Sequence, residues 1–261
     1  MQFSGLIVLE TDDFFGGGIG DQYHHAIKEL RKRYNFGKWV DLMDESHEYG
    51  GRTIKQLANY AFVISMQRYL HERAREIDLP RGRGKNPLAE ASAVEITAFR
   101  GLNDKIAWAA REGMPNGSGD ASLLASTLPN PRVNYLQEAN ACLRRLLQHN
   151  ATITIQPIPL DKLRLVQFSD SSLGNTSGGT SQTAWMVCAC DSDLFNGEEA
   201  TVSPLTYRSH QMDRAGSATL LVEANSMSEG LAETEWVASW IGLCKDLSLI
   251  HISEPTRPLY I

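Results

Sequence analysis

Hydrophobic and polar positions first alternate in short blocks. Residues 5–9 form an apolar run rich in branched side chains, as in a buried strand. The acidic pair Asp12 and Asp13 follows, and then two phenylalanines and three glycines. This order predicts a hairpin with carboxylates at its tip, followed by a flexible glycine loop. Residues 21–33 predict a helix capped by Asp21.

Helical periodicity dominates from residue 66 to residue 150. Residues 66–77 predict a basic helix, and apolar positions three or four residues apart predict helices around 99–109 and 133–147. Proline and glycine predict loops at 80–87, 115–118 and 129–131, and residues 36–65 mix short strand-like pieces with turns. The first 150 residues therefore begin with a small sheet fragment and end mostly helical.

The pattern changes near Ala151. Apolar runs predict strands at 163–168, 183–190 and 201–207, the first ending at Ser169 and Asp170. A long helical stretch over 218–240 follows and contains Glu223. Three strands and a helix indicate an α/β arrangement. The whole chain is thus predicted to be α+β or α/β, with one domain at 1–158 and another at 159–246.

Composition narrows the class of protein. Of the 261 residues, 42% are hydrophobic and 21% charged, which is typical of a globular chain. We expect no membrane-spanning segment and no signal peptide, and four scattered cysteines suit a reducing, intracellular compartment. Residues 1–160 carry 19 basic and 18 acidic side chains, whereas residues 161–261 carry 6 and 13. Overall charge therefore does not favour nucleic-acid binding, which would need local basic patches.

Two acidic sites are candidates for metal chemistry. Adjacent carboxylates such as Asp12 and Asp13 repel each other unless a cation compensates them, although a solvated acidic turn is the commoner arrangement. Asp170 at a strand end and Glu223 on the following helix could converge over the sheet edge and hold metal for phosphodiester hydrolysis. Alternatively, Asp170 begins a turn and Glu223 is an exposed helix residue.

Both acidic sites, in this order, resemble the reverse transcriptase–ribonuclease H region of copia-type retrotransposon polyproteins. The sequence GLIVLETDDF at 5–14 is similar to the polymerase motif of two aspartates on a palm hairpin. The sequences FSDSS at 168–172 and SATLLVEA at 217–224 resemble the first catalytic strand and the glutamate helix of ribonuclease H. Residues 1–158 would then be part of the palm and a helical thumb, and 159–246 a truncated ribonuclease H-like mixed-sheet domain.

The resemblance implies a function for each acidic site. Asp12 and Asp13 would hold Mg²⁺, or Mn²⁺ in its place, for attack of a primer hydroxyl on a deoxynucleotide. Asp170 and Glu223 would hold the same ion to activate water that cleaves RNA in an RNA–DNA hybrid. The implied partners are template–primer, hybrid, deoxynucleotides in the full-length protein and other polyprotein segments. The implied location is the cytoplasm, including virus-like particles, and no membrane is involved.

Basic residues supply the expected nucleic-acid contacts. The Gly-rich loop with Arg81, Arg83 and Lys85 could bind template–primer phosphates, and Arg208 and Arg214 could bind a hybrid strand. Without the resemblance, the loop is more simply a solvated basic segment.

Three departures from the family limit the expected activity. Glu10 stands where the family usually has an aromatic residue, the upstream palm and fingers are missing, and the chain stops before the later ribonuclease H aspartates. Residues 247–261 resemble a translated sequencing adapter and are excluded from the fold. We therefore expect no polymerase activity and little or no nuclease activity. The alternatives are a non-catalytic nucleic-acid-binding or adaptor protein, and a decayed product without a stable fold.

Overall fold

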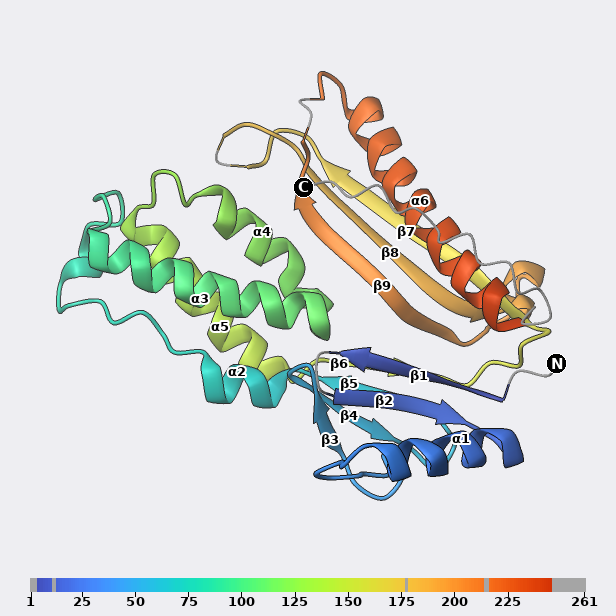
Figure 1. The fold of residues 1–261 in the computed structure, drawn as a ribbon. Coiled ribbons are helices and arrows are strands. Elements are labelled where there is room, and N and C mark those ends of the chain that lie inside the picture. The colour runs from blue at the N-terminus through green and yellow to red at the C-terminus, as the bar shows by residue number, and fades with distance from the viewer. Residues whose placement is uncertain (1–3, 11–12, 177, 214–215, 246–261) are drawn as a thin grey trace. The chain divides into compact units, whose positions relative to one another are not determined.

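The computed structural model describes residues 4–10, 13–176, 178–213 and 216–245. The chain forms two compact units (Figure 1). One comprises residues 1–39 together with 235–261, and the other comprises residues 40–234. The predicted tail at 247–261 lies outside the described residues.

The first unit contains the predicted hairpin. Strands β1 (Gly5–Glu10) and β2 (Asp13–Gly18) pair antiparallel, and helix α1 (Gly20–Arg33) follows. The prediction of a flexible glycine loop is wrong, because the three glycines are part of β2. The ring of Tyr23 on α1 covers the end of the hairpin, where a Cβ at Gly5 or Gly18 would lie 2.3–2.4 Å from it. Ile19, not Asp21, occupies the N-cap position of α1.

A four-stranded antiparallel sheet begins the second unit. Its strands are β3 (His47–Tyr49), β4 (Arg52–Gln56), β5 (Phe62–Ser65) and β6 (Thr152–Ile155), in the order β3-β4-β5-β6. Strand β6 forms because β5, about ninety residues earlier, supplies its hydrogen-bonding partner.

Helices form the largest core of the second unit. They are α2 (Gln67–Arg73), α3 (Ala93–Glu112), α4 (Ser118–Ser126) and α5 (Val133–His149), with short 3₁₀ turns at Arg83–Lys85 and Pro115–Gly117. Phe99, Leu102 and Ile106 on α3 are at most 2% exposed, as the periodicity predicted, and pack with Leu136 and Leu146 of α5. Helix α2 is shorter than predicted and ends at Arg73.

The last part of the second unit is a three-stranded antiparallel sheet. Strands β7 (Leu163–Ser172), β8 (Gln182–Asp191) and β9 (Val202–Gln211) lie in the order β7-β8-β9, with a 3₁₀ turn at Ser192–Asn196. The long helix α6 (Thr219–Lys245) follows, and residues 219–234 of it belong to this unit. Figure 1 shows this part of α6 along the β7 side of the sheet. All four elements were predicted. However, β7 continues two residues past Asp170, so Asp170 lies within the strand and not at its end.

The observed architecture is mixed α and β, in agreement with the predicted class. The predicted domain boundary at residue 158 falls inside the second unit, where the Gln156 backbone N–H donates to Ser203 Oγ at 2.9 Å. Among the described residues, no helix combines the length and the apolar character needed to cross a membrane.

Candidate functional site

Helix α6 is fixed to the sheet beside Asp170. The hydroxyl of Ser226, fully buried, lies 2.8 Å from the carbonyl oxygens of both Asp170 on β7 and Ala184 on β8. A buried hydroxyl needs such acceptors, because an unmade hydrogen bond there costs about 1–3 kcal/mol. Ser226 therefore determines which turn of α6 lies over Asp170.

A second contact orients α6 along β7. Gln167 Nε2 donates to the carbonyl of Met227 at 3.3 Å. Gly230 makes room for that side chain, because a Cβ at this position would lie 2.1 Å from Gln167 Nε2. Residues spaced by three or four share a helix flank, so Glu223 lies on the same flank as Met227 and Gly230, one turn nearer Asp170.

The two predicted ligands therefore lie on neighbouring elements, Asp170 on β7 and Glu223 on α6. Asp170 is exposed and Glu223 is half-buried. Alternation along β7 places the Asp170 side chain on the face opposite Gln167, which contacts α6. The Asp170 carboxylate therefore lies on the face away from α6, and a metal ion shared with Glu223 stays a prediction. In the described part of the chain, no group of three His, Cys, Asp or Glu side chains is assembled for a metal.

The chemistry of the two predicted ligands suits one kind of ion. Mg²⁺ is commonly held by one or two carboxylates, with water and substrate phosphates completing its octahedron. Asp170 is exposed and Glu223 half-buried, and each offers the carboxylate oxygen that Mg²⁺ prefers. Their donor chemistry fits the ion, whereas one ion held by both carboxylates stays a prediction.

The other predicted acidic site lies at the tip of the first hairpin. Asp13 is exposed and begins β2, and its Cα pairs across the hairpin with that of Glu10. Asp12 lies outside the described residues. The hairpin itself is confirmed, and metal binding at its tip stays a prediction.

The basic residues predicted to contact nucleic acid differ in whether their side chains are already hydrogen-bonded within the protein or exposed to solvent. Arg83 donates from Nε and Nη2 to the two carboxylate oxygens of Glu95, both at 2.8 Å, and from Nη2 to the carbonyl of Glu90 at 2.6 Å. Its guanidinium is thus used to hold the basic loop against α3. Arg81, Lys85 and Arg208 are exposed, and Arg214 lies outside the described residues.

Glu95 is the other half of this contact and was not singled out from the sequence. It caps α3 together with Ser92, whose backbone N–H donates to Glu95 Oε2 at 2.7 Å while Ser92 Oγ accepts from the Glu95 backbone. Hydrogen bonding from Arg83 lowers the pKa of Glu95 to about 2. The Ser-x-x-Glu spacing of a capping box was the signal that could have revealed it.

A half-buried polar cluster between α6 and β9 was also missed. His210 Nε2 lies 3.2 Å from Glu229 Oε2, and Glu229 also accepts a hydrogen bond from Trp185. Burial lowers the pKa of His210 to about 4, with Arg208 adding to the effect, and burial raises the pKa of Glu229. The imidazole is therefore neutral near pH 7, and its contact with Glu229 joins the middle of α6 to β9.

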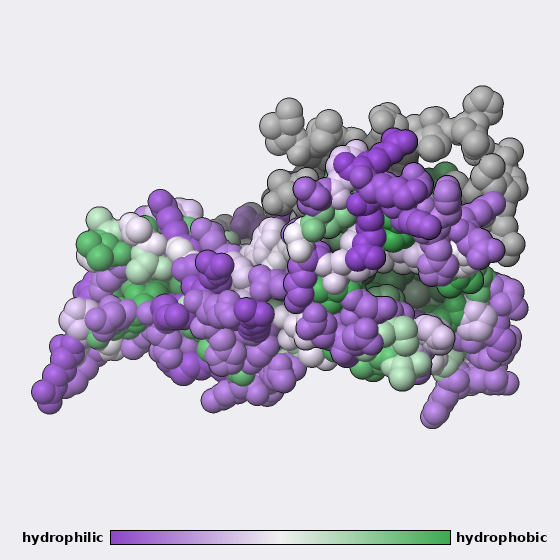
Figure 2. Space-filling view, turned by 60° about the horizontal axis from the view of Figure 1, so that its bottom comes forward, coloured by the Kyte–Doolittle hydropathy of each residue, from purple (hydrophilic) through white to green (hydrophobic). Residues whose placement is uncertain are grey.

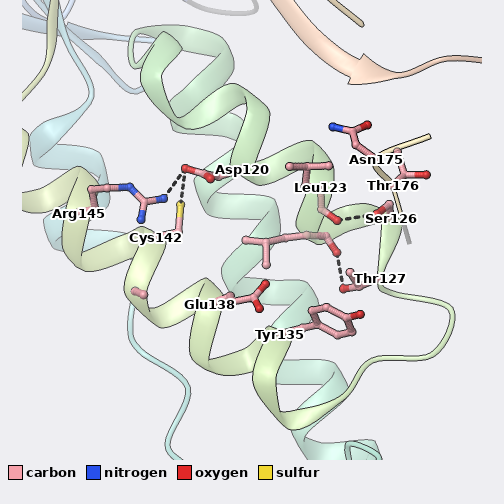
Figure 3. Close-up of a pocket in the computed structure, with 12 residues that line it drawn as sticks. Asp120, Leu123, Ser126, Thr127, Tyr135, Glu138, Cys142, Arg145, Asn175 and Thr176 are labelled. Atoms are coloured by element: carbon pink, nitrogen blue, oxygen red, sulfur yellow. Dashed lines mark hydrogen bonds and ion pairs between the residues drawn. The ribbon is translucent and has the colours of Figure 1, made fainter. Parts of the chain in front are cut away.

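A cavity of about 420 Å³ lies between α4, α5 and the turn after β7 (Figure 3). Arg145 and Asp120 form an ion pair at its wall, and Cys142 Sγ lies 3.8 Å from Asp120 Oδ2. Burial raises the pKa of Cys142 to about 12, so its thiol stays protonated and is not a nucleophile at neutral pH. The cavity therefore offers no reactive group that competes with the β7 edge as the candidate site.

Comparison with protein-family models, with curated proteins and with solved structures gave no match for this chain. The functional reasoning accordingly rests on the geometry around Asp170 and Glu223.

Proposed function

We propose that the chain is a fragment of a retrotransposon polyprotein whose residues 159–246 are the first part of a ribonuclease H-like domain. In that domain Asp170 and Glu223 would bind Mg²⁺ for cleavage of RNA in an RNA–DNA hybrid. Residues 1–158 would be part of a reverse transcriptase palm and thumb, with Asp12 and Asp13 in its polymerase site. As this fragment, the chain would show no polymerase activity and little or no nuclease activity.

The position of Ser226 is the observation that most favours the proposal. Its two hydrogen bonds hold the turn of α6 that follows Glu223 against the backbone of β7 and β8, which supports a site built from two acids 53 positions apart in the chain. Three antiparallel strands followed by this helix agree with the order that the resemblance implies.

The protein residues would act mainly by positioning. Bound Mg²⁺ would lower the pKa of a coordinated water and neutralise charge on the scissile phosphate. Asp170 lies on a ten-residue strand and Glu223 on a 27-residue helix, so both carboxylates stand on regular elements and not on loops. Ser226 and Gln167 would act as positioning residues, because they determine which turn of α6 contacts the sheet and how the helix runs along β7.

A metal-binding experiment tests the site without depending on turnover. Mn²⁺ titrated into ¹⁵N-labelled protein should broaden amide signals around Asp170 and Glu223 before others, and Mg²⁺ should reverse the broadening. Asp170→Asn and Glu223→Gln should each remove the effect. Asp161→Asn is the matched control, because Asp161 is an exposed acid just before β7. Equal broadening at Asp161 and Asp170 would contradict a specific site.

Activity assays with an RNA–DNA hybrid provide a separate check. Robust Mg²⁺-dependent cleavage that Asp170→Asn abolishes would overturn the expectation that this fragment is inactive. Hybrid binding in gel shifts, without cleavage and without specific Mn²⁺ broadening, would favour a non-catalytic adaptor instead.

A further inference from the structure

We propose that the outer edge of β7 is a dimerisation surface, on which β7 of a second copy adds antiparallel to make a continuous six-stranded sheet. This inference does not depend on the proposed metal chemistry. Among the described strands, β8 is the only one that pairs with β7. A ten-residue edge strand presents a row of backbone groups that can pair with another strand.

The contact at Ser226 identifies which backbone groups point outward. One hydroxyl reaches the carbonyl oxygens of both Asp170 and Ala184, which requires these directly opposite residues to point their carbonyls toward each other. Asp170 and Ala184 are therefore a hydrogen-bonded pair, and alternate residues of β7 point the other way. The free edge thus carries the N–H and C=O groups of Leu165, Gln167 and Ser169.

Exposed side chains surround this edge. On β7, Phe168 is 54% exposed, and Arg164 and Asp170 are exposed beside it. On the adjoining flank of α6, the exposed fractions are 81%, 61% and 51% for Leu220, Met227 and Leu231. Over the face of the molecule that Figure 2 presents, hydrophobic residues reach the surface among hydrophilic ones. Apolar side chains beside an unpaired edge are typical of an interaction surface.

The charges on β7 favour a second copy of the same strand as the partner, and they determine the register in which the two strands pair. A two-fold axis at Gln167 places Arg164 opposite Asp170 of the second copy, and the symmetric pair forms as well. The same register places Val166 opposite Phe168. Both are non-hydrogen-bonded pairs, in which side chains approach most closely. Axes at Leu165 or Ser169 would instead place Arg164 opposite Val166, or Asp170 opposite Phe168, and form no ion pair.

Existing contacts are compatible with this pairing. Arg164 donates from Nη1 to the carbonyls of Asp161 and Leu163, so it can meet the second copy's carboxylate through Nη2. A two-fold axis perpendicular to the sheet leaves both copies of α6 on the same face, where Met227 and Leu231 of each copy would approach the other. The dimer would bring Arg164 to Asp170 and would thereby compete with a cation there.

Charge reversal tests the proposal directly. Sedimentation equilibrium over a range of concentrations should show a monomer–dimer equilibrium. Arg164→Asp or Asp170→Arg alone should weaken dimerisation about tenfold, because each places like charges opposite each other twice. The double variant Arg164→Asp, Asp170→Arg should restore it to about the original level. Arg100→Glu, at an exposed position on α3, is the control and should leave dimerisation unchanged.

Amide hydrogen exchange supplies a second readout. Raising the protein concentration should increase protection at Leu165, Gln167 and Ser169, while Val166 and Phe168, which already pair with β8, should change little. A chain that stays monomeric at millimolar concentration would refute the proposal. Failure of the double variant to restore dimerisation would also refute it. A dimer in which the amides of Leu165, Gln167 and Ser169 gain no protection would refute it as well, because such a dimer uses another strand or surface.

Discussion

Replacing Glu95 by Gln should destabilise the protein in a pH-dependent way. The substitution removes the carboxylate that receives two hydrogen bonds from Arg83 and one from the Ser92 backbone. Loss of a helix N-terminal capping interaction costs about 0.5–2 kcal/mol, and a hydrogen bond to a charged group contributes about 1.5–3 kcal/mol. Because the Arg83 side chain is 28% exposed and can regain water, we expect a net loss of about 2 kcal/mol at pH 7.

The sign of the pH dependence follows from the pKa of Glu95. Its folded-state value of about 2 lies below the ordinary value of 4.5, so the stabilisation is present above pH 4.5 and is lost as the pH falls toward 2. Urea unfolding followed by circular dichroism should therefore give a difference between Glu95→Gln and the parent that is large at pH 7 and small near pH 2. Asp104→Asn, at an exposed position on the same helix, should change stability by less than about 0.5 kcal/mol. A difference for Glu95→Gln that is independent of pH would refute the reasoning.

Further predictions concern α6 and the basic loop. Ser226→Ala should cost about 1–3 kcal/mol in urea unfolding and should reduce Mn²⁺ broadening at Glu223, because the buried hydroxyl that fixes this turn of α6 on the sheet is lost. Burial holds the pKa of the native His210 imidazole below its ordinary value, so the unfolded chain binds the proton first and the folded protein loses stability between about pH 6.5 and pH 4. His210→Gln should remove this loss in urea unfolding measured across that pH range. Replacing Arg81 and Lys85 by Ala should leave the midpoint of thermal unfolding unchanged. It should lower the slope of the logarithm of the hybrid-binding constant against the logarithm of salt concentration by about two counterions, and an unchanged slope would exclude the loop as a phosphate contact.

Local sequence patterns were sufficient for most of the individual elements. The apolar spacing of Phe99, Leu102 and Ile106 identified the buried face of α3, because three or four residues return a side chain to the same side of a helix. Apolar runs found β7, β8 and β9, and the long periodic stretch found α6. The Ser-x-x-Glu spacing at Ser92 and Glu95 also carried the signal of the capping box.

Contacts between distant segments were decided only by the tertiary structure. Whether residues 152–155 form a strand depended on β5, and whether the glycines of β2 form a loop or a strand depended on pairing with β1. The sequence suggested that Asp170 and Glu223 could converge, but only Ser226 shows which turn of α6 lies beside β7. Periodicity constrains the backbone over a few residues, whereas the partner of a buried face or an unpaired hydrogen-bonding group can come from anywhere in the chain.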